Sequence, residues 1–250
     1  MIVIHVPHSS KTIPDDVSDL FVLNDAEFEG ELLRMTDWYV DELFALSATK
    51  ATAVTYRVSR LVCDPERFED DAEEPMAERG MGVIYTSTND GRKLRSKPKP
   101  AERKSLLARY YRPHHDRLTA AVAEVLAVEG KCLIVDAHSF PSRPLPYELD
   151  QRLDRPAICI GTDKYHTPPW LRRPAFDASS ARFDTVAFDR PFAGTLVPMA
   201  YYRRDRRVHS IMIEVNRGLY IDEATGEKLP CFDEVASRLR DAVDGLDDSV

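Results

Sequence analysis

The stretch CLIVDAHS, residues 132–139, is an apolar run that ends in a histidine and a serine. Two other runs end in the same manner: IVIHVPH (residues 2–8) and IMIE (residues 211–214). A buried strand that stops at a polar side chain is typical of an open α/β sheet, which presents its chemistry at the carboxyl edge of its strands. The three runs therefore predict an α/β fold with a composite site built from His8, His138 and Glu214.

Alternating strand-like and helical patterns fill the rest of the chain, which favours helices on both faces of a largely parallel or mixed sheet. Strands are predicted at 2–6, 51–63, 132–137, 157–161 and 208–215. Helices are predicted at 25–34, from Thr36 or Asp37 through Leu46, at 101–129 with a break near Pro113, and at 233–246. The polar segments 64–100 and 163–195 are interpreted as long loops that cover the site.

Composition limits the possible functions. The 250 residues carry a formal net charge of −8, which argues against a general nucleic-acid partner, and no stretch reaches the ~20 apolar residues of a membrane span. The four cysteines are widely spaced, as expected of reduced thiols. No glycine-rich loop follows the first strand, which weakens a nucleotide-binding interpretation. We expect one cytoplasmic domain over residues 1–250.

A metal site is the first interpretation of the strand ends. Zinc accepts imidazole nitrogen and carboxylate oxygen, and a catalytic zinc keeps one position open for water. His8 and His138 supply two ligands. The third ligand is the uncertain one: Asp37 is the best carboxylate, although an aspartate there also suits a helix N-cap. Iron, manganese or cobalt accept the same ligands.

Glu214 is the candidate general base, because an apolar setting raises a carboxyl pKa, although a buried salt bridge to Arg67 or Arg217 is the alternative. Arg67 is a candidate for oxyanion stabilisation, and Arg143 or Arg217 for holding a substrate carboxylate.

Four other histidines receive weaker assignments. His115 is a candidate substrate contact, or else lies on a helix surface. His5, within its strand, is interpreted as structural, and His209 as a possible support of the pocket. His166, in a proline-rich loop, is expected to be exposed to solvent.

These segments, in their order and spacing, resemble the N-formylglutamate amidohydrolase family over nearly the whole chain. The matching segments are VPHSS (6–10) with Ile13-Pro14, TDWYVD (36–41), residues 60–67, YRPHHD (111–116), DAHS (136–139), and Ile213-Glu214 before GLYID (218–222). The family is similar in fold to the zinc carboxypeptidases, so the resemblance implies a three-layer α/β/α sandwich around a mixed, twisted sheet.

The resemblance also implies a function. It is that of a zinc amidohydrolase that converts N-formylglutamate, a small N-acyl amino acid, to formate and glutamate. In zinc carboxypeptidases the last metal ligand is a histidine in a His-Ser turn, which His138-Ser139 resembles, and the catalytic glutamate resembles Glu214. Ser139 is added as a substrate contact. The first histidine of those enzymes is followed three residues later by a glutamate, whereas this chain has Lys11 there.

The sequence therefore predicts zinc held by His8, Asp37 and His138, with Glu214 as base and Arg67 as oxyanion stabiliser. Two alternatives stay open: a zinc amidase or carboxypeptidase-like enzyme for another N-acyl amino acid or peptide, and a non-catalytic relative that binds such a ligand. The sequence does not determine the oligomeric state.

Overall fold

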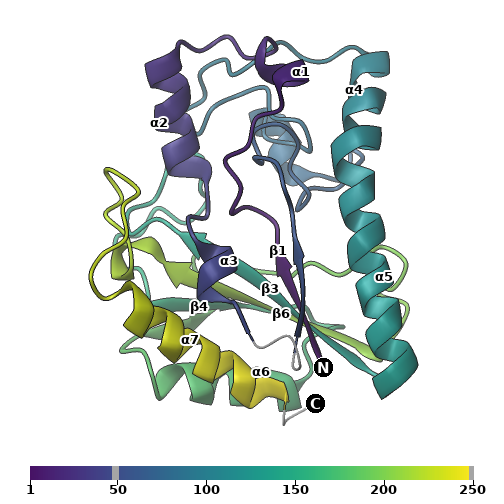
Figure 1. The fold of residues 1–250 in the computed structure, drawn as a ribbon, viewed down its shortest axis with the longest axis vertical. Helices are drawn as coiled ribbons and strands as arrows, with labels where there is room; N and C mark the ends of the chain where they lie inside the picture. Colours follow the sequence, from purple (N-terminus) through teal and green to yellow (C-terminus); the bar gives the residue numbers. More distant parts are fainter. Residues whose placement is uncertain (47–50, 248–250) are drawn as a thin grey trace.

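The computed structural model describes residues 1–46 and 51–247, which form a six-stranded sheet with helices packed on it (Figure 1). The strand order is β2-β1-β3-β6-β4-β5. The strands are β1 (Ile2–Val6), β2 (Ala51–Thr55), β3 (Cys132–Phe140), β4 (Ile158–Gly161), β5 (Val186–Phe188) and β6 (Val208–Asn216). The first four in spatial order are parallel, and β4 runs antiparallel to β6. The predicted mixed α/β sheet is confirmed.

The helices that surround the sheet differ in length. They are α1 (Asp15–Ser18), α2 (Asp25–Met35), α3 (Val40–Leu43), α4 (Pro100–Leu106), α5 (Arg112–Glu129), α6 (Pro169–Ser180) and α7 (Phe232–Asp247), with the short turns η1 (Pro75–Arg79), η2 (Leu107–Tyr111) and η3 (Arg217–Leu219). No helix in the described part of the chain is long and apolar enough to cross a membrane.

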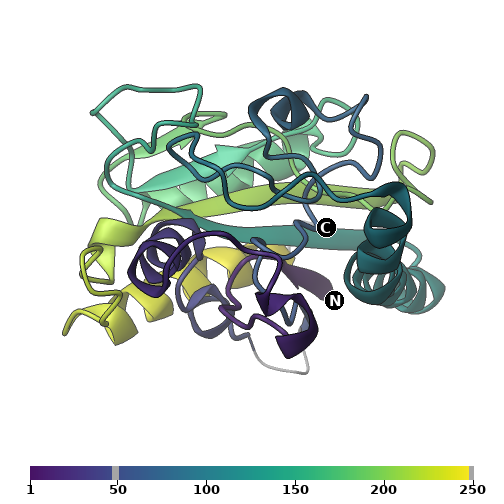
Figure 2. The ribbon, with the colours of Figure 1, turned by 90° about the horizontal axis from the view of Figure 1, so that it is seen from above.

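The two faces of the sheet bury different sets of side chains, because successive residues of a strand point to opposite faces. Ile4, Val135 and Ile213 belong to the face that packs against α3, α6 and α7. Ile134 and other residues of the opposite face pack against α5 and the segment 196–202. Figure 2 shows α7 on one side of the sheet and the loops of the 60–100 segment on the other.

The strand predicted at 51–63 is too long, since β2 ends at Thr55. Its parallel partner β1 ends at Val6, which is paired with Thr55, and Pro7 has no amide hydrogen to continue the ladder. Residues 56–63 therefore turn away from the sheet, and the apolar run at 61–63 is buried in the layer formed by residues 81–94 and α4 instead.

Pro113 marks the predicted break within 101–129. The chain forms α4, then the π-helical turn η2, and then α5, in which Pro113 lies in the first turn. A proline inside a helix removes one hydrogen bond and crowds the carbonyl group four residues earlier, and a widened π turn relieves both. The prediction of a break here is confirmed.

The loop predicted at 163–195 is wrong in part, because this segment contains α6 and β5. Pro168 and Pro169 stand at the N-cap and the first position of α6, where a proline is favourable rather than disruptive. The segment 64–100 has turns and η1, and several of its apolar residues, among them Met81 and Leu94, are buried. Both segments are therefore more than surface loops, and residues of each line the cavity described below.

Gly161, at the end of β4, allows β6 and a loop beyond it to approach closely. A Cβ atom there would overlap with the Gly194 carbonyl oxygen and with the Met212 side chain. We expect Gly161→Ala to destabilise the fold by about 1–3 kcal/mol through overpacking. Urea unfolding measures this change. Gly245→Ala in α7, where the added methyl meets nothing within 4 Å, is the matched control and is expected to stabilise slightly. Equal effects of both changes would contradict the prediction.

Candidate functional site

Two pairs of strand residues bring the polar side chains together on one face of the sheet. His5 of β1 is in register with Asp136 of β3, and His138 of β3 with Glu214 of β6. All four point to the face covered by α5, because each alternates with an apolar residue of the opposite core. The predicted convergence of His138 and Glu214 follows from this register.

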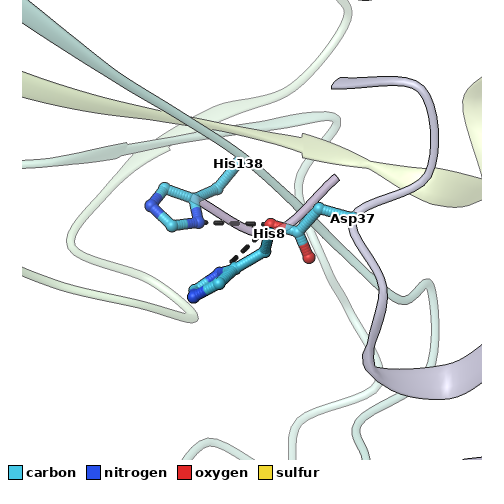
Figure 3. Close-up of side chains that lie close together, drawn as sticks. All are labelled: His8, Asp37 and His138. Carbon is cyan, nitrogen blue, oxygen red and sulfur yellow. Dashed lines mark hydrogen bonds and ion pairs between the residues drawn. The ribbon is translucent and has the colours of Figure 1, made fainter. Parts of the chain in front are cut away.

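His8, Asp37 and His138 form a compact buried cluster (Figure 3). The Nδ1 atoms of both histidines face Asp37 Oδ2, at 3.2 Å from His138 and 3.6 Å from His8. Two ligands of a tetrahedral zinc ion, each at about 2.1 Å from it, lie roughly 3.4 Å apart. His8 Nδ1 is buried and has no hydrogen-bond partner. The donor atoms and their spacing therefore fit one divalent transition metal.

Asp37 reaches this cluster from the short connection between α2 and α3, so the predicted helix start at Thr36 or Asp37 is wrong. Thr36 ends α2 in an extended conformation, and α3 begins only at Val40. The Asp37 amide donates to the carbonyl oxygen of His8, which fixes the backbone next to β1. Because its side chain is not used as an N-cap, the carboxylate is directed at the two histidines.

Arg217 and Ser139 hold the Asp37 carboxylate. Arg217 Nη2 donates to Asp37 Oδ1 at 2.7 Å, and the Ser139 amide donates to Oδ2 at 3.2 Å. Burial opposes ionisation of Asp37, but His138, His8 and the Arg217 guanidinium keep its pKa well below the usual range. Asp37 is therefore a carboxylate at neutral pH, the form that a metal binds.

Asp64 and Arg60 belong to this centre, although the sequence analysis did not select them. His8 Nε2 donates to Asp64 Oδ1 at 2.7 Å, and Arg60 donates to Asp64 Oδ2 at 2.8 Å. The Nε2 hydrogen bond leaves the His8 Nδ1 lone pair free on the side of Asp37. A signal was present, since Asp64 follows the apolar run Leu61-Val62-Cys63 just as the other site residues follow theirs.

Glu214 differs from the other carboxylates of the centre because its Oε2 atom is buried without a hydrogen-bond partner. Burial, opposed by His138 and reinforced by Asp37, raises the pKa of Glu214 to about 8. The side chain contacts the cavity in which the cluster lies. This environment is compatible with the role of general base for which the sequence analysis selected Glu214, and Arg217 is paired with Asp37 rather than with Glu214.

A cavity of about 380 Å³ opens onto the cluster, which is large enough for a small molecule. Its polar wall includes Arg60, Arg67, Arg217 and Tyr147, and its other wall is formed by residues 192–197 with Met199 and Tyr202. Arg67 Nε is buried without a hydrogen-bond partner and lies 3.7 Å from Asp64. Among the three arginines, Arg67 has the fewest partners of its own.

Of the other residues predicted to contact the substrate, some line the cavity and one does not. Ser139 and His115 line the cavity, and His115 Nε2 donates to the Pro65 carbonyl oxygen at 3.0 Å. Burial lowers the pKa of His115 to about 4, so its ring is neutral. Arg143 is exposed and is not among the residues that line the cavity, so its predicted contact with a substrate carboxylate finds no support.

His5, His114 and His166, which lie outside the cluster of His8, Asp37 and His138, are fully buried. His166, which the sequence analysis expected in solvent, donates from Nδ1 to the Val208 carbonyl oxygen and accepts at Nε2 from the Arg203 amide. That expectation is wrong, because the segment of His166 is hydrogen-bonded to β6 and the rings of Tyr165 and Tyr202 pack against its imidazole. His5, interpreted as structural, is hydrogen-bonded to Asp136 and His114.

The fold and the cluster define an α/β protein with a His-Asp-His centre suited to a metal, next to an unpaired glutamate. The model of the N-formylglutamate amidohydrolase family matches residues 1–221. The chain belongs to the N-formylglutamate amidohydrolase family.

Individual relatives agree with this membership. The chain is 30% identical to an N-formylglutamate deformylase of Pseudomonas aeruginosa over 78% of this chain and 74% of the relative. The crystal structure of an N-formylglutamate amidohydrolase from Ralstonia eutropha superposes with a TM-score of 0.79 at 25% identity, over 99% of this chain and 92% of that one. A protein from Agrobacterium tumefaciens shares the fold, with a TM-score of 0.66 at 22% identity over 97% and 90% of the two chains.

The pKa of Glu214 predicts a pH dependence of stability for the metal-free protein. The pKa is raised from 4.5 to about 8. The contribution of Glu214 to the free energy of unfolding is therefore fully present below pH 4.5 and is lost as the pH rises through about 8. Glu214→Gln removes this titration. With chelator present, we expect the melting temperature of the variant to rise relative to that of the wild type as the pH increases from 5 to 9, because only the wild type loses this contribution. A difference that does not change with pH would contradict it.

Proposed function

We propose that this chain is a zinc-dependent amidohydrolase that converts N-formylglutamate and water to formate and glutamate. The observation that supports this most is the spacing of His8, Asp37 and His138 beside the unpaired Glu214 in one cavity. The names of the Pseudomonas and Ralstonia relatives supply the substrate. The enzyme is proposed to act in the cytoplasm, where free thiols such as Cys63 and Cys132 stay reduced. The proposed pathway is histidine degradation.

His8 Nδ1, Asp37 Oδ2 and His138 Nδ1 are the atoms that would hold the ion. Two imidazoles and one carboxylate suit zinc, and also iron, manganese or cobalt, so the choice of zinc rests on the family resemblance. When bound, the ion would lower the pKa of a water molecule towards ~7 and polarise the carbonyl group of the substrate. Asp64, through its hydrogen bond to His8 Nε2, keeps the ring in the tautomer that this binding requires.

Glu214 would act as the general base and then as the general acid. Its carboxylate takes a proton from the water whose oxygen attacks the formyl carbon. When the C–N bond breaks, the same proton goes to the amine nitrogen of the departing glutamate. A pKa raised by burial suits both transfers, because a group that exchanges protons efficiently has a pKa near the working pH.

Arg67 would stabilise the negative charge that develops on the formyl oxygen, because its guanidinium lines the cavity and has few partners in the protein. Arg217 lines the cavity too, but its donors are engaged with Asp37, Ser139 and the Arg34 carbonyl oxygen. Its main task is therefore to hold Asp37. Recognition of the substrate carboxylates falls to the cationic wall as a whole, namely Arg60, Arg67 and Arg217, with Ser139 and His115 beside it.

Two variants distinguish the role of a metal ligand from that of the general base. We expect His138→Ala to lose metal and activity together, because one of three protein ligands is removed. Glu214→Gln is expected to keep its metal and to lose about 10²–10⁴-fold in kcat. Metal analysis of the purified proteins and a formate-release assay with N-formylglutamate measure both effects. Full activity of either variant would reject the site.

Arg67 and Arg143 are compared in a second pair of variants. We expect Arg67→Ala to lower kcat/KM by about 10²–10³-fold, as loss of one oxyanion donor does. Arg143→Ala is expected to match the wild type, because Arg143 is exposed and away from the cavity lining. Steady-state kinetics measure both. A raised KM in Arg143→Ala alone would restore the role that the sequence suggested for it.

Two alternative functions would give different experimental results. If N-formylglutamate is inert and another N-acyl amino acid or a peptide is cleaved in a substrate panel, the chain is a metal amidase or carboxypeptidase-like enzyme of different specificity. If the protein holds no stoichiometric metal and Glu214→Gln binds the ligand unchanged, a non-catalytic binding protein is the better interpretation.

A further inference from the structure

A second group of buried side chains lies on the far side of His138 from Asp37, and the proposed mechanism does not use it. His5 Nδ1 lies 2.9 Å from Asp136 Oδ1 and 3.2 Å from Glu66 Oε1. His5 Nε2 lies 2.8 Å from His114 Nε2. His5 and Asp136 are completely buried, and Glu66 contacts the cavity. These atoms are close enough to hold a metal or to hydrogen-bond one another.

The distances favour hydrogen bonds. A separation of 2.9 Å between His5 and Asp136 is that of an N–H···O bond, and it is shorter than the roughly 3.4 Å between two ligands of a tetrahedral ion. In the first cluster, the 3.6 Å between His8 Nδ1 and Asp37 Oδ2 is too long for a hydrogen bond, whereas the 3.2 Å between His138 Nδ1 and Asp37 Oδ2 is within that range. The two clusters therefore differ in their closest contact, which is 2.9 Å between His5 and Asp136 and 3.2 Å between His138 and Asp37, although both contain histidine and carboxylate.

The protonation of His5 agrees with this difference. Burial lowers its pKa, but hydrogen bonds and charge interactions with Asp136 and Glu66 outweigh burial and raise it to about 9. His5 Nδ1 donates to Asp136 and Nε2 shares a hydrogen bond with His114, so both ring nitrogens of His5 are engaged within the protein.

Asp136 connects this group to both the metal cluster and the cavity wall. Its Oδ1 atom lies 3.2 Å from His138 Nε2 as well as 2.9 Å from His5. Its Oδ2 atom accepts from the Leu196 amide at 2.8 Å. Leu196 belongs to the wall segment 192–197, which Ser210 of β6 also holds through a hydrogen bond to the Leu196 carbonyl oxygen. One carboxylate therefore contacts a metal-ligand histidine and the wall that faces the substrate.

We infer that Asp136, fixed by His5, is a positioning residue that sets the orientation of His138 and of the wall segment 192–197 together. By accepting from Nε2 it leaves the Nδ1 lone pair of His138 directed at the metal cluster, and by accepting from Leu196 it fixes the wall at the matching position. This inference rests on the proposed function for its substrate, but not for its metal-affinity readout.

Asp136→Asn tests the inference because an amide keeps the size of the side chain but offers only one accepting oxygen in place of two. The variant cannot accept from His138 and Leu196 together. We expect about 10–100-fold weaker zinc binding by the metal-free protein, measured against a chromophoric chelator, as for other partners of ligand histidines. With N-formylglutamate as substrate, KM is expected to rise and kcat to fall.

Glu31→Gln is the matched control for loss of a buried carboxylate. Glu31 is completely buried, accepts from the Asn89 amide, and lies outside the cavity lining. We expect it to lower the melting temperature without changing zinc affinity, KM or kcat. A loss of zinc affinity as large as that of Asp136→Asn would attribute both effects to general destabilisation and overturn the inference.

Two variants of His5 complete the test. The side-chain amide nitrogen of asparagine can replace Nδ1, and that of glutamine can replace Nε2. We therefore expect His5→Asn, which keeps a donor for Asp136, to retain more zinc affinity than His5→Gln.

Three outcomes are decisive. Wild-type zinc affinity and KM in Asp136→Asn would overturn the inference. Two zinc ions per chain, one of them lost in His5→Gln, would also overturn it and identify a second metal site. Normal zinc binding by a wild type that does not cleave N-formylglutamate would reject the proposed function, while a zinc-affinity loss in Asp136→Asn would still support the inference.

Discussion

The Asp37 carboxylate is the point on which the candidate site depends. Its two oxygens interact with Arg217 after β6, with the Ser139 amide and His138 of β3, and with His8 after β1. A buried carboxylate with fewer partners would favour its neutral form or another conformation. Because Arg217 neutralises it from one side, the other side can face two imidazole nitrogens and remain charged. Three distant segments of the chain are thereby held at one place.

Charge pairing explains why so many ionisable groups can be buried here. Asp64 is paired with Arg60, Asp37 with Arg217, and Asp136 with His5. These carboxylates stay ionised in spite of burial, Asp64 mainly through Arg60, Asp37 through His138, His8 and Arg217, and Asp136 through His138 and His5. The pairings of Asp64 and Asp37 leave one side of His8 and one side of Asp37 open towards the cluster. Glu214 has no such partner, which is why its pKa moves in the opposite direction. The same cavity thus contains carboxylates suited to binding a metal and one suited to transferring a proton.

Part of this arrangement was predictable because it follows from periodicity within single strands. The apolar runs before His8, His138 and Glu214 indicate buried strands, and parallel strands bring their carboxyl ends to one edge. Helix boundaries were less predictable. Thr36-Asp37 has the composition of an N-cap, yet the hydrogen bonds of Asp37 to Arg217 and Ser139 outweigh a local capping preference. Similarly, prolines at 168 and 169 suggested a loop but begin α6.

By itself, the sequence determined the α/β class, the strand that leads to His8, the strands that carry His138 and Glu214, and the resemblance to the N-formylglutamate amidohydrolase family. Those properties depend on the order of residues along single segments. The tertiary structure decided which side chains meet: Asp64 behind His8, Arg217 against Asp37, Asp136 between His138 and the cavity wall, and Arg143 outside it. Apart from the contact of Asp136 with His138 in the same strand, these pairings join residues 56 to 180 positions apart, and only the register of the sheet and the packing of loops upon it establish them.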